Sequence, residues 1–166
     1  MVTGAACSYG DRVSGSGTQS YDVTAESTAP PAAVWALLVD ARSWPVWSGV
    51  GSLEVAASQG LSADGRDGVG AVRAFRTGRT VTKERITALD PERRFSYEGV
   101  DVPVMVDYQA AVELRETPAG GTRIRWHGTY RVGRGKALFF RWYLRRFMRA
   151  MATGLAEHAG GPVRRP

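Results

Sequence analysis

The feature that most constrains the fold is an amphipathic stretch near the C-terminus, Lys136–Ala159. At 100° per residue its large apolar side chains fall on one side, and arginines occupy the opposite side. Gly160, Gly161 and Pro162 follow directly, as glycine and proline commonly do after a helix. The sequence therefore predicts a long helix packed against a sheet. Its apolar stripe consists of Ala137, Phe140, Leu144, Phe147, Met148, Met151 and Leu155.

The region before this helix has the pattern of short strands and turns. Alternation predicts a first strand over Gln19–Ser27, and two prolines then open a helix that continues over Ala32–Val39. A second short helix or turn carries Trp44 and Trp47. The order is strand, two short helices, about six antiparallel strands and a terminal helix, which is an α+β arrangement. The later strands are predicted over Val50–Ala57, Gly70–Thr77, Arg79–Ala88, Arg94–Glu98, Pro103–Glu116 and Thr122–Val132.

Two hairpins allow the register to be predicted. A turn at Gly78 would place Phe75 opposite Thr82 and Arg73 opposite Glu84, with Glu84 pointing inward. In the last hairpin, Tyr108, Ala110, Val112 and Leu114 would face Tyr130, Gly128, Trp126 and Ile124 respectively.

The length of 166 residues is typical of one domain, which we place over residues 19–160. Residues 1–18 form a Gly- and Ser-rich leader expected to be disordered, and residues 161–166 a short disordered tail. No apolar run approaches the roughly 20 residues of a membrane span, and the lone Cys7 fits a reducing compartment. We therefore expect a soluble, cytoplasmic protein without stable membrane insertion.

The formal charge of +6 raises the possibility of a nucleic-acid partner or an anionic membrane surface. The arginines are spread over most elements without a nucleic-acid motif, so a solvated basic surface is favoured and no nucleic-acid binding is predicted. Phe139 and Trp142 lie among the arginines on the polar side of the terminal helix. Such an exposed aromatic and basic surface would suit either a dimer contact or the membrane-touching edge of a lipid carrier. We expect a monomer or a homodimer.

The element order resembles the START-like (SRPBCC) superfamily with its helix-grip fold, and in particular polyketide cyclase or dehydratase-like proteins. The resemblance covers roughly residues 20–159. It rests on the segments Ala29–Asp40, Trp44–Trp47, Glu84–Pro91 and Gly121–Trp126. These motifs specify the fold better than an activity, because the same fold serves enzymes and carriers.

The resemblance implies a deep apolar cavity between the sheet and the terminal helix, holding a polyketide, a lipid or a similar hydrophobic molecule. By this resemblance Glu84 and Tyr108 would face the cavity, and inward aromatic side chains would either line it or fill the core. Trp44 and Trp47 would either cap the core or gate the cavity. The predicted ligand-binding residues are Trp47, Phe75, Thr82, Tyr97, Ala110, Trp126, Tyr130, Phe147 and Met151.

The predicted catalytic residues are Glu84, Arg73 and Tyr108. Glu84 would act as a base in an aldol cyclisation or dehydration, with Arg73, Tyr97 or Tyr108 as hydrogen-bond donors. The alternative is that Arg73 and Glu84 form a structural salt bridge, which would make Glu84 a weak base. Three functions remain open: a cyclase or dehydratase-like enzyme, a non-catalytic carrier or sensor, and an interaction module with a filled core.

No cofactor or metal is predicted. The sequence has two histidines and one cysteine, without the spacing of a metal site, and no glycine-rich phosphate loop. His127 is expected to face solvent, and His158 falls in the last turn of the terminal helix, where a cation suits the helix dipole.

Overall fold

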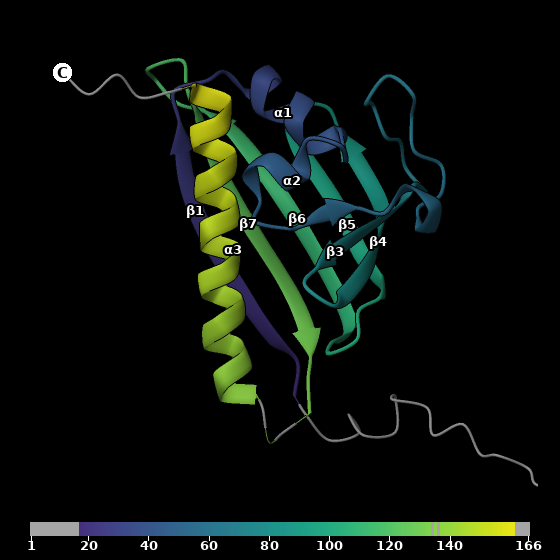
Figure 1. Cartoon of the computed structure of the whole chain (residues 1–166). Helices are drawn as coiled ribbons and strands as arrows, with labels where there is room; N and C mark the ends of the chain where they lie inside the picture. The colour runs from purple at the N-terminus through teal and green to yellow at the C-terminus, as the bar shows by residue number, and fades with distance from the viewer. Residues whose placement is uncertain (1–16, 134, 136, 162–166) are drawn as a thin grey trace, which may run out of the picture.

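Seven antiparallel strands form one curved sheet in the computed structural model, which describes residues 17–133, 135 and 137–161. The elements are β1 (Gln19–Ser27), α1 (Pro31–Val39), α2 (Trp44–Trp47), β2 (Ser52–Leu53), the short 3-10 helix η2 (Val55–Ala57), β3 (Val72–Thr77), β4 (Thr80–Asp90), β5 (Arg94–Asp101), β6 (Val106–Glu116), β7 (Thr122–Arg131) and α3 (Ala137–Gly160). Across the sheet the strands follow the order β1-β7-β6-β5-β4-β3-β2, and α3 lies along the β1 side (Figure 1). The predicted α+β arrangement is confirmed.

The turn at Gly78 sets the pairing of β3 with β4. Gly78 has a φ of 60°, the left-handed region that glycine adopts without strain. Arg73 faces Glu84 and Phe75 faces Thr82, as predicted. Because side chains alternate along a strand, these four positions share the inner face of the sheet.

The predicted strand over Val50–Ala57 is wrong over most of its length. Only β2 pairs with β3, and η2 follows it. The hydroxyl of Ser58 donates to the carbonyl oxygen of Glu54 at 2.8 Å, and the Ser58 N–H donates to that of Val55 at 3.1 Å. These local hydrogen bonds compete with sheet pairing over Val55–Ala57, and the chain meets β3 again at Gln59, which bridges Val72.

The predicted pairing of Tyr108 with Tyr130 is interrupted by a β-bulge. The register between β6 and β7 shifts between Val106 and Gln109. Asp107, at the bulge, has a φ of 53°. An extra residue on one strand re-aims the side chains beside it. The other three predicted pairs of this hairpin are confirmed.

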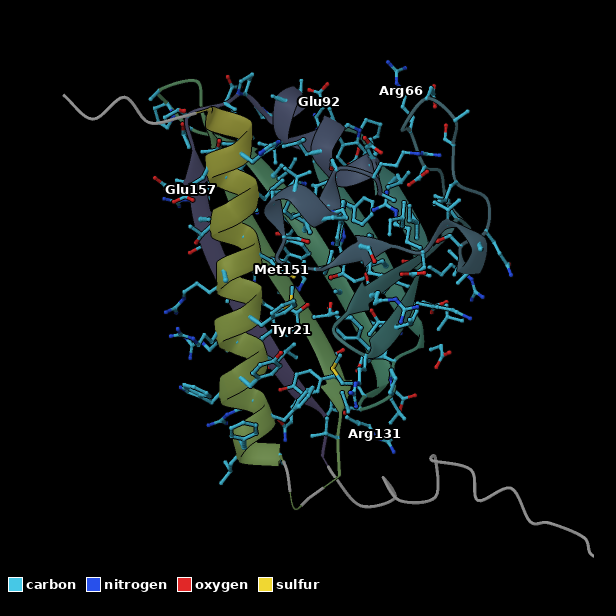
Figure 2. The ribbon with its side chains drawn as sticks, in the orientation of Figure 1. Tyr21, Arg66, Glu92, Arg131, Met151 and Glu157 are labelled. Atoms are coloured by element: carbon cyan, nitrogen blue, oxygen red, sulfur yellow. The ribbon has the colours of Figure 1, made fainter. Side chains whose placement is uncertain are left out.

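Helix α3 buries the stripe that its periodicity predicts, most completely in its second half. Figure 2 shows Met151 on the side of α3 turned towards the sheet. Gly154 lies directly against the carbonyl oxygen of Trp47, where a Cβ atom would collide. The backbones of α2 and α3 therefore touch at this point. The fully buried residues of α3 are Leu144, Met148, Met151, Ala152, Leu155 and Ala156.

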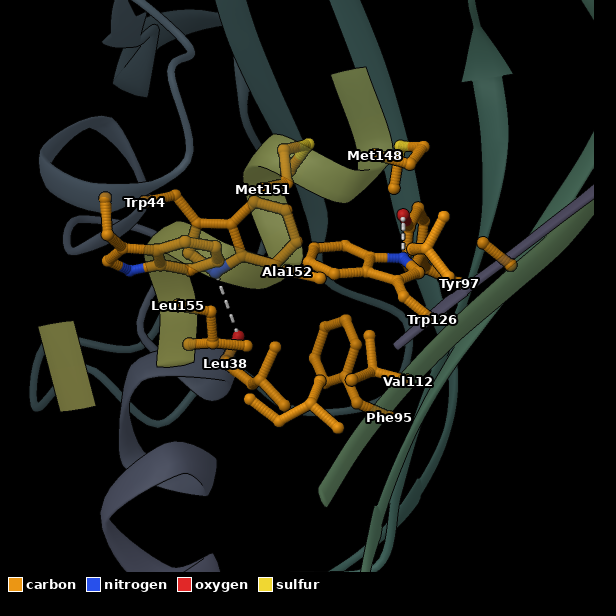
Figure 3. Packing of buried hydrophobic residues seen from close by; sticks show 14 of the residues in the cluster. Leu38, Trp44, Phe95, Tyr97, Val112, Trp126, Met148, Met151, Ala152 and Leu155 are labelled. Carbon is orange, nitrogen blue, oxygen red and sulfur yellow. Dashed lines mark hydrogen bonds between the residues drawn. The ribbon is translucent and has the colours of Figure 1, made fainter. Parts of the chain in front are cut away.

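Helices α1 and α2 cover one end of the interior. The ring of Trp44 stacks on that of Phe75 with 5.2 Å between centroids, and its indole N–H donates to the carbonyl oxygen of Leu38 at 3.1 Å (Figure 3). Trp44 and Trp47 are both buried, and their rings lie 5.1 Å apart. Of the two readings of these tryptophans, the packing favours a cap on the core.

No helix within the described ranges is long and apolar enough to cross a membrane. The predicted leader over residues 1–18 and the predicted tail over residues 161–166 fall almost entirely outside the described residues.

Candidate ligand-binding site

Arg73 on β3 is buried under the last turn of α1. Its Nη1 donates to the carbonyl oxygen of Leu38 at 2.8 Å, and its Nη2 donates to that of Val39 at 2.6 Å. Such carbonyls lack partners where a helix ends, and a cation suits the negative end of the helix dipole. Arg73 therefore ties the sheet to α1 and caps that helix.

The ion-pair partner of Arg73 is Asp67, which the sequence analysis missed. Nε of Arg73 lies 3.2 Å from Oδ2 of Asp67, close enough for charge attraction but not aligned as a hydrogen bond. The carboxylate also accepts from the backbone N–H groups of Ala41 at 3.1 Å and Ser62 at 2.8 Å. Burial lowers the pKa of Arg73 to about 10 against the attraction of Asp67, so the guanidinium stays charged at neutral pH.

Glu84 is the register neighbour of Arg73, but the two side chains form no ion pair with each other in the described part of the chain. The salt bridge considered from the sequence is therefore replaced by the pair of Arg73 with Asp67. Glu84 is neither fully exposed nor fully buried, so it keeps some contact with solvent while neighbouring atoms displace part of its water. Burial raises the pKa of Glu84 to about 7, and the charge of Arg73 offsets this only in part. At neutral pH the carboxyl group is divided between its protonated and ionised forms.

Three buried tyrosines form a hydrogen-bonded chain on the inner face of the sheet. Nε1 of Trp126 donates to the hydroxyl of Tyr97 at 3.0 Å (Figure 3). The hydroxyls of Tyr97 and Tyr108 lie 3.1 Å apart, and those of Tyr108 and Tyr21 lie 2.8 Å apart. Tyr21 crosses Gly128 of β7, where a Cβ atom would lie 2.8 Å from the tyrosine ring. Tyr21 was not among the predicted site residues, although the alternation of its strand could have revealed it.

One hydroxyl hydrogen of the tyrosine chain is not used in its hydrogen bonds. The three tyrosines carry three O–H hydrogens, and the contact with Trp126 uses the indole hydrogen instead. The two tyrosine–tyrosine bonds use two of the three. One hydroxyl hydrogen therefore has no acceptor among the described residues.

The electrostatics of the tyrosine chain keep it protonated. Burial is the largest cause that raises the pKa of Tyr21, Tyr97 and Tyr108 above the ordinary value near 10. The negative charge of Glu84 raises all three further, so its carboxyl group lies within electrostatic reach of every hydroxyl. The arrangement combines proton donors with a nearby group that accepts a proton close to neutral pH.

The predicted lining residues differ in how far they are enclosed. Thr82 on β4 and Phe147 on α3 are partly exposed, as are Met105 and Phe140. The ring of Phe140 packs edge-on against Tyr130, with 5.7 Å between centroids. The others belong to the buried core, namely Trp47, Phe75, Tyr97, Ala110, Trp126, Tyr130 and Met151.

His127 lies apart from this site. Its Nε2 is 3.2 Å from Oε1 of Glu113, and it alternates with the buried Trp126 along β7. Over the residues that the structure describes, no group of three or more histidine, cysteine, aspartate or glutamate side chains has the arrangement of a metal site.

The sequence profile of the family described as "Polyketide cyclase / dehydrase and lipid transport" matches residues 18–160. No curated protein matches the sequence. Two solved bacterial structures share the fold. A protein from Thermobifida fusca has a TM-score of 0.70 at 23% identity, covering 85% of this chain and 93% of its own. An uncharacterised protein from Bacillus thuringiensis has a TM-score of 0.66 at 18% identity, covering 85% of this chain and 98% of its own.

A third similar structure is the di-domain ARO/CYC protein BexL from the BE-7585A biosynthetic pathway. Its TM-score is 0.67 at 20% identity, and the match covers 90% of this chain and 51% of that protein. This chain thus corresponds to about half of the two-domain protein. At these identities the three likenesses establish a common fold.

Proposed function

The chain belongs to the polyketide cyclase, dehydrase and lipid transport family, with the START-like helix-grip fold, and from this we propose that it binds a hydrophobic, oxygen-bearing small molecule beside Glu84. The observation that carries the proposal is that Glu84 lies within electrostatic reach of the tyrosine chain. Glu84 is a partly exposed carboxyl with a pKa of about 7, and the tyrosine chain beside it has one hydroxyl hydrogen to donate. A carbonyl compound would use both.

In our proposal the reaction is an intramolecular aldol cyclisation or the dehydration that follows it. Glu84 removes a proton from a carbon between two carbonyls, and the resulting enolate carbon attacks a third carbonyl of the same molecule. The tyrosine chain donates to the oxygen that becomes negative, and that oxygen ends as a hydroxyl group. Glu84 returns its proton to that oxygen, which completes the aldol step. In the dehydration Glu84 removes the second proton of the same carbon, a carbon–carbon double bond forms as the C–O bond breaks, and the proton passes from Glu84 to the departing hydroxide, which leaves as water. Arg73 takes no part, because its guanidinium is occupied by Asp67 and α1.

The acid–base requirements of this chemistry match the groups available. A general base works best when its pKa lies near the working pH, and burial brings Glu84 to about 7. A pair with Arg73 would have lowered that value, so the diversion of Arg73 to Asp67 favours catalysis. Holding a flexible chain in one reactive conformation would supply a further part of the acceleration.

The test compares Glu84→Gln with Glu98→Gln. Glu98 lies on the neighbouring strand but pairs with Arg85 on the surface at 3.0 Å, so its replacement controls for the loss of a carboxylate. A synthetic poly-β-ketone thioester serves as probe, and mass spectrometry separates enzymatic from spontaneous ring products. We expect turnover to fall by at least about 100-fold in Glu84→Gln alone, the scale of general base catalysis. Equal turnover in both variants would remove Glu84 from the mechanism.

A second candidate function is carriage of a hydrophobic ligand without turnover. It is favoured by the apolar, partly exposed side chains of Met105, Phe140 and Phe147 and by the lipid transport named in the family description. Native mass spectrometry of the purified protein separates the two functions. A co-purifying fatty acid or lipid that Glu84→Gln retains equally well would favour the carrier.

A further inference from the structure

The first half of α3 exposes an apolar surface to solvent. Leu138 is 79% exposed, Phe139 70%, Trp142 62% and Tyr143 45%. At 100° per residue the first three lie opposite the buried stripe of the helix. Four exposed arginines lie among these residues and directly after them on the helix. We call the eight residues the α3 patch: Leu138, Phe139, Arg141, Trp142, Tyr143, Arg145, Arg146 and Arg149.

The arginines of the α3 patch differ from those of the sheet. On the strands, Arg76, Arg85, Arg123, Arg125 and Arg131 each lie within 3.0 Å of a carboxylate oxygen. The four arginines of the α3 patch form no ion pair with another described residue, and α3 has no acidic residue before Glu157. The patch is therefore a cluster of uncompensated positive charge beside exposed aromatic side chains.

The apolar part of the patch lies at the end of the molecule where other apolar side chains are exposed. Figure 1 shows the start of α3 at the same end as the loop between β5 and β6. Val100 and Val104, at that loop, are 44% and 46% exposed. Beside the patch, a groove of about 860 Å³ between α3 and β1 is lined by patch arginines together with Leu138 and Trp142. Asp22 of β1 also lines the groove, and its carboxylate is paired with Arg125 at 2.6 Å. Polar headgroups and apolar chains would both find partners here.

We propose that the α3 patch docks the protein on an anionic lipid surface. Leucine and tryptophan side chains enter the boundary between headgroups and acyl chains, while neighbouring arginines pair with the phosphates. The helix is otherwise held in the fold by its buried stripe, so docking is peripheral. The proposal is independent of Glu84 and of any turnover.

Two other occupants fit less well. A nucleic acid would use the arginines, but an exposed aliphatic side chain such as Leu138 gives it neither stacking nor hydrogen bonds. A second copy of the chain in an isologous contact would bring the patch against itself and place its arginines together, with no acidic residue in this part of α3 to compensate them. The combination of apolar side chains with unpaired positive charge favours a lipid surface.

The experiment is flotation of the full chain with vesicles. One set contains phosphatidylcholine with about a third phosphatidylglycerol, and the other contains phosphatidylcholine alone, because only the first carries the negative surface potential that attracts arginine. The test variant combines Arg145→Gln, Arg146→Gln and Arg149→Gln. The matched control combines Arg76→Gln, Arg85→Gln and Arg123→Gln, which removes the same charge from the sheet. A second test variant, Trp142→Ala, removes an apolar anchor and leaves the charge unchanged.

We expect binding to the anionic vesicles that weakens with salt, and little binding to the neutral ones. At about fivefold per arginine, the helix triple variant should lose on the order of 100-fold in affinity. The sheet triple variant should bind like the unmodified protein, and Trp142→Ala should bind more weakly. All variants should melt within a few degrees of the unmodified protein.

Three outcomes would overturn the proposal. One is the absence of flotation with anionic vesicles, and another is an equal loss in the two triple variants. The third is a patch-dependent dimer, or patch-dependent binding to a single-stranded oligonucleotide, without vesicle binding.

Discussion

Two carboxyl groups lie close to Arg73, and their surroundings differ in nearly every respect. Asp67 is almost fully buried, lies 3.2 Å from Nε of Arg73 and accepts two backbone hydrogen bonds. Glu84 faces Arg73 across the strands, yet it is partly exposed and has a pKa raised to about 7. Buried charge is costly unless partners satisfy it. Asp67 is therefore suited to holding the structure together, and Glu84 to exchanging a proton.

The largest expected effect comes from breaking the satisfied pair. Asp67→Asn leaves the guanidinium of Arg73 charged and buried without its carboxylate, which should lower the free energy of unfolding by about 3–5 kcal/mol. Urea denaturation followed by circular dichroism measures the loss. Glu54→Gln is the control, because Glu54 pairs with Arg76 at 2.7 Å on the surface and should cost under about 1 kcal/mol. If the two losses are similar, the Asp67 pair does not carry the stability assigned to it.

The second effect depends on pH and concerns Glu84. Its folded pKa of about 7 lies above the value near 4.5 of an unperturbed glutamate. Between these values the folded chain binds more protons than the unfolded chain, so stability falls as the pH rises through this range. The full difference corresponds to about 3 kcal/mol, present below about pH 4.5 and lost above about pH 7.

Glu84→Gln isolates this term from the other carboxylates. Asp22 and Glu113, whose pKa values are lowered in the folded state, titrate in both proteins and cancel in the comparison. Urea unfolding at about pH 5 and about pH 8 should show the unmodified protein losing stability relative to Glu84→Gln as the pH rises. A constant difference between the two proteins across that range would mean that Glu84 titrates as an ordinary surface carboxylate.

The sequence predicted only part of the difference between Asp67 and Glu84. Counting back from the turn at Gly78 correctly placed Arg73 opposite Glu84, because side chains alternate strictly along paired strands. The same counting suggested a salt bridge between them. Asp67 takes that place from a loop with no periodic pattern, and the path of such a loop depends on tertiary contacts that local sequence patterns do not reveal.

The tyrosine chain was likewise predicted only in part from the sequence. Alternation brought Tyr97 and Tyr108 into the predicted site, and it would have added Tyr21 had β1 been read as part of the interior. The bulge at Asp107 could not be foreseen, because a left-handed aspartate has no reliable sequence signal. Periodicity thus located the residues of the site, while their hydrogen bonds depend on local departures from regular structure.

A smaller effect is expected in the middle of the tyrosine chain. Tyr108→Phe removes the hydroxyl that joins Tyr97 to Tyr21 and should lower the free energy of unfolding by about 1 kcal/mol. Tyr143→Phe, on the exposed face of α3, should change it by less than about 0.5 kcal/mol. Denaturant titration of the two variants makes the comparison. If Tyr108→Phe costs nothing while Tyr143→Phe does, the buried chain adds no stability and the surface hydroxyl does.

The smallest expected effect concerns packing. It tests whether the interior is packed less tightly around Phe147 than around Leu155. Phe147 is partly exposed, whereas Leu155 is fully buried against the core. Phe147→Trp should therefore change the free energy of unfolding by less than about 0.5 kcal/mol, because the larger ring can extend outward. Leu155→Phe adds volume where none is free and should cost about 1–3 kcal/mol.

Ligand affinity should change in Phe147→Trp even though stability does not. Phe147→Trp should weaken binding of a fatty acid or aromatic probe, measured by quenching of tryptophan fluorescence, if the ligand lies beside Phe147. A stability loss in Phe147→Trp as large as that in Leu155→Phe would mean that both regions are packed to the same density. The distinction between Asp67 and Glu84 would then be one of hydrogen bonding and charge alone, and a ligand would have to displace side chains in order to reach Glu84.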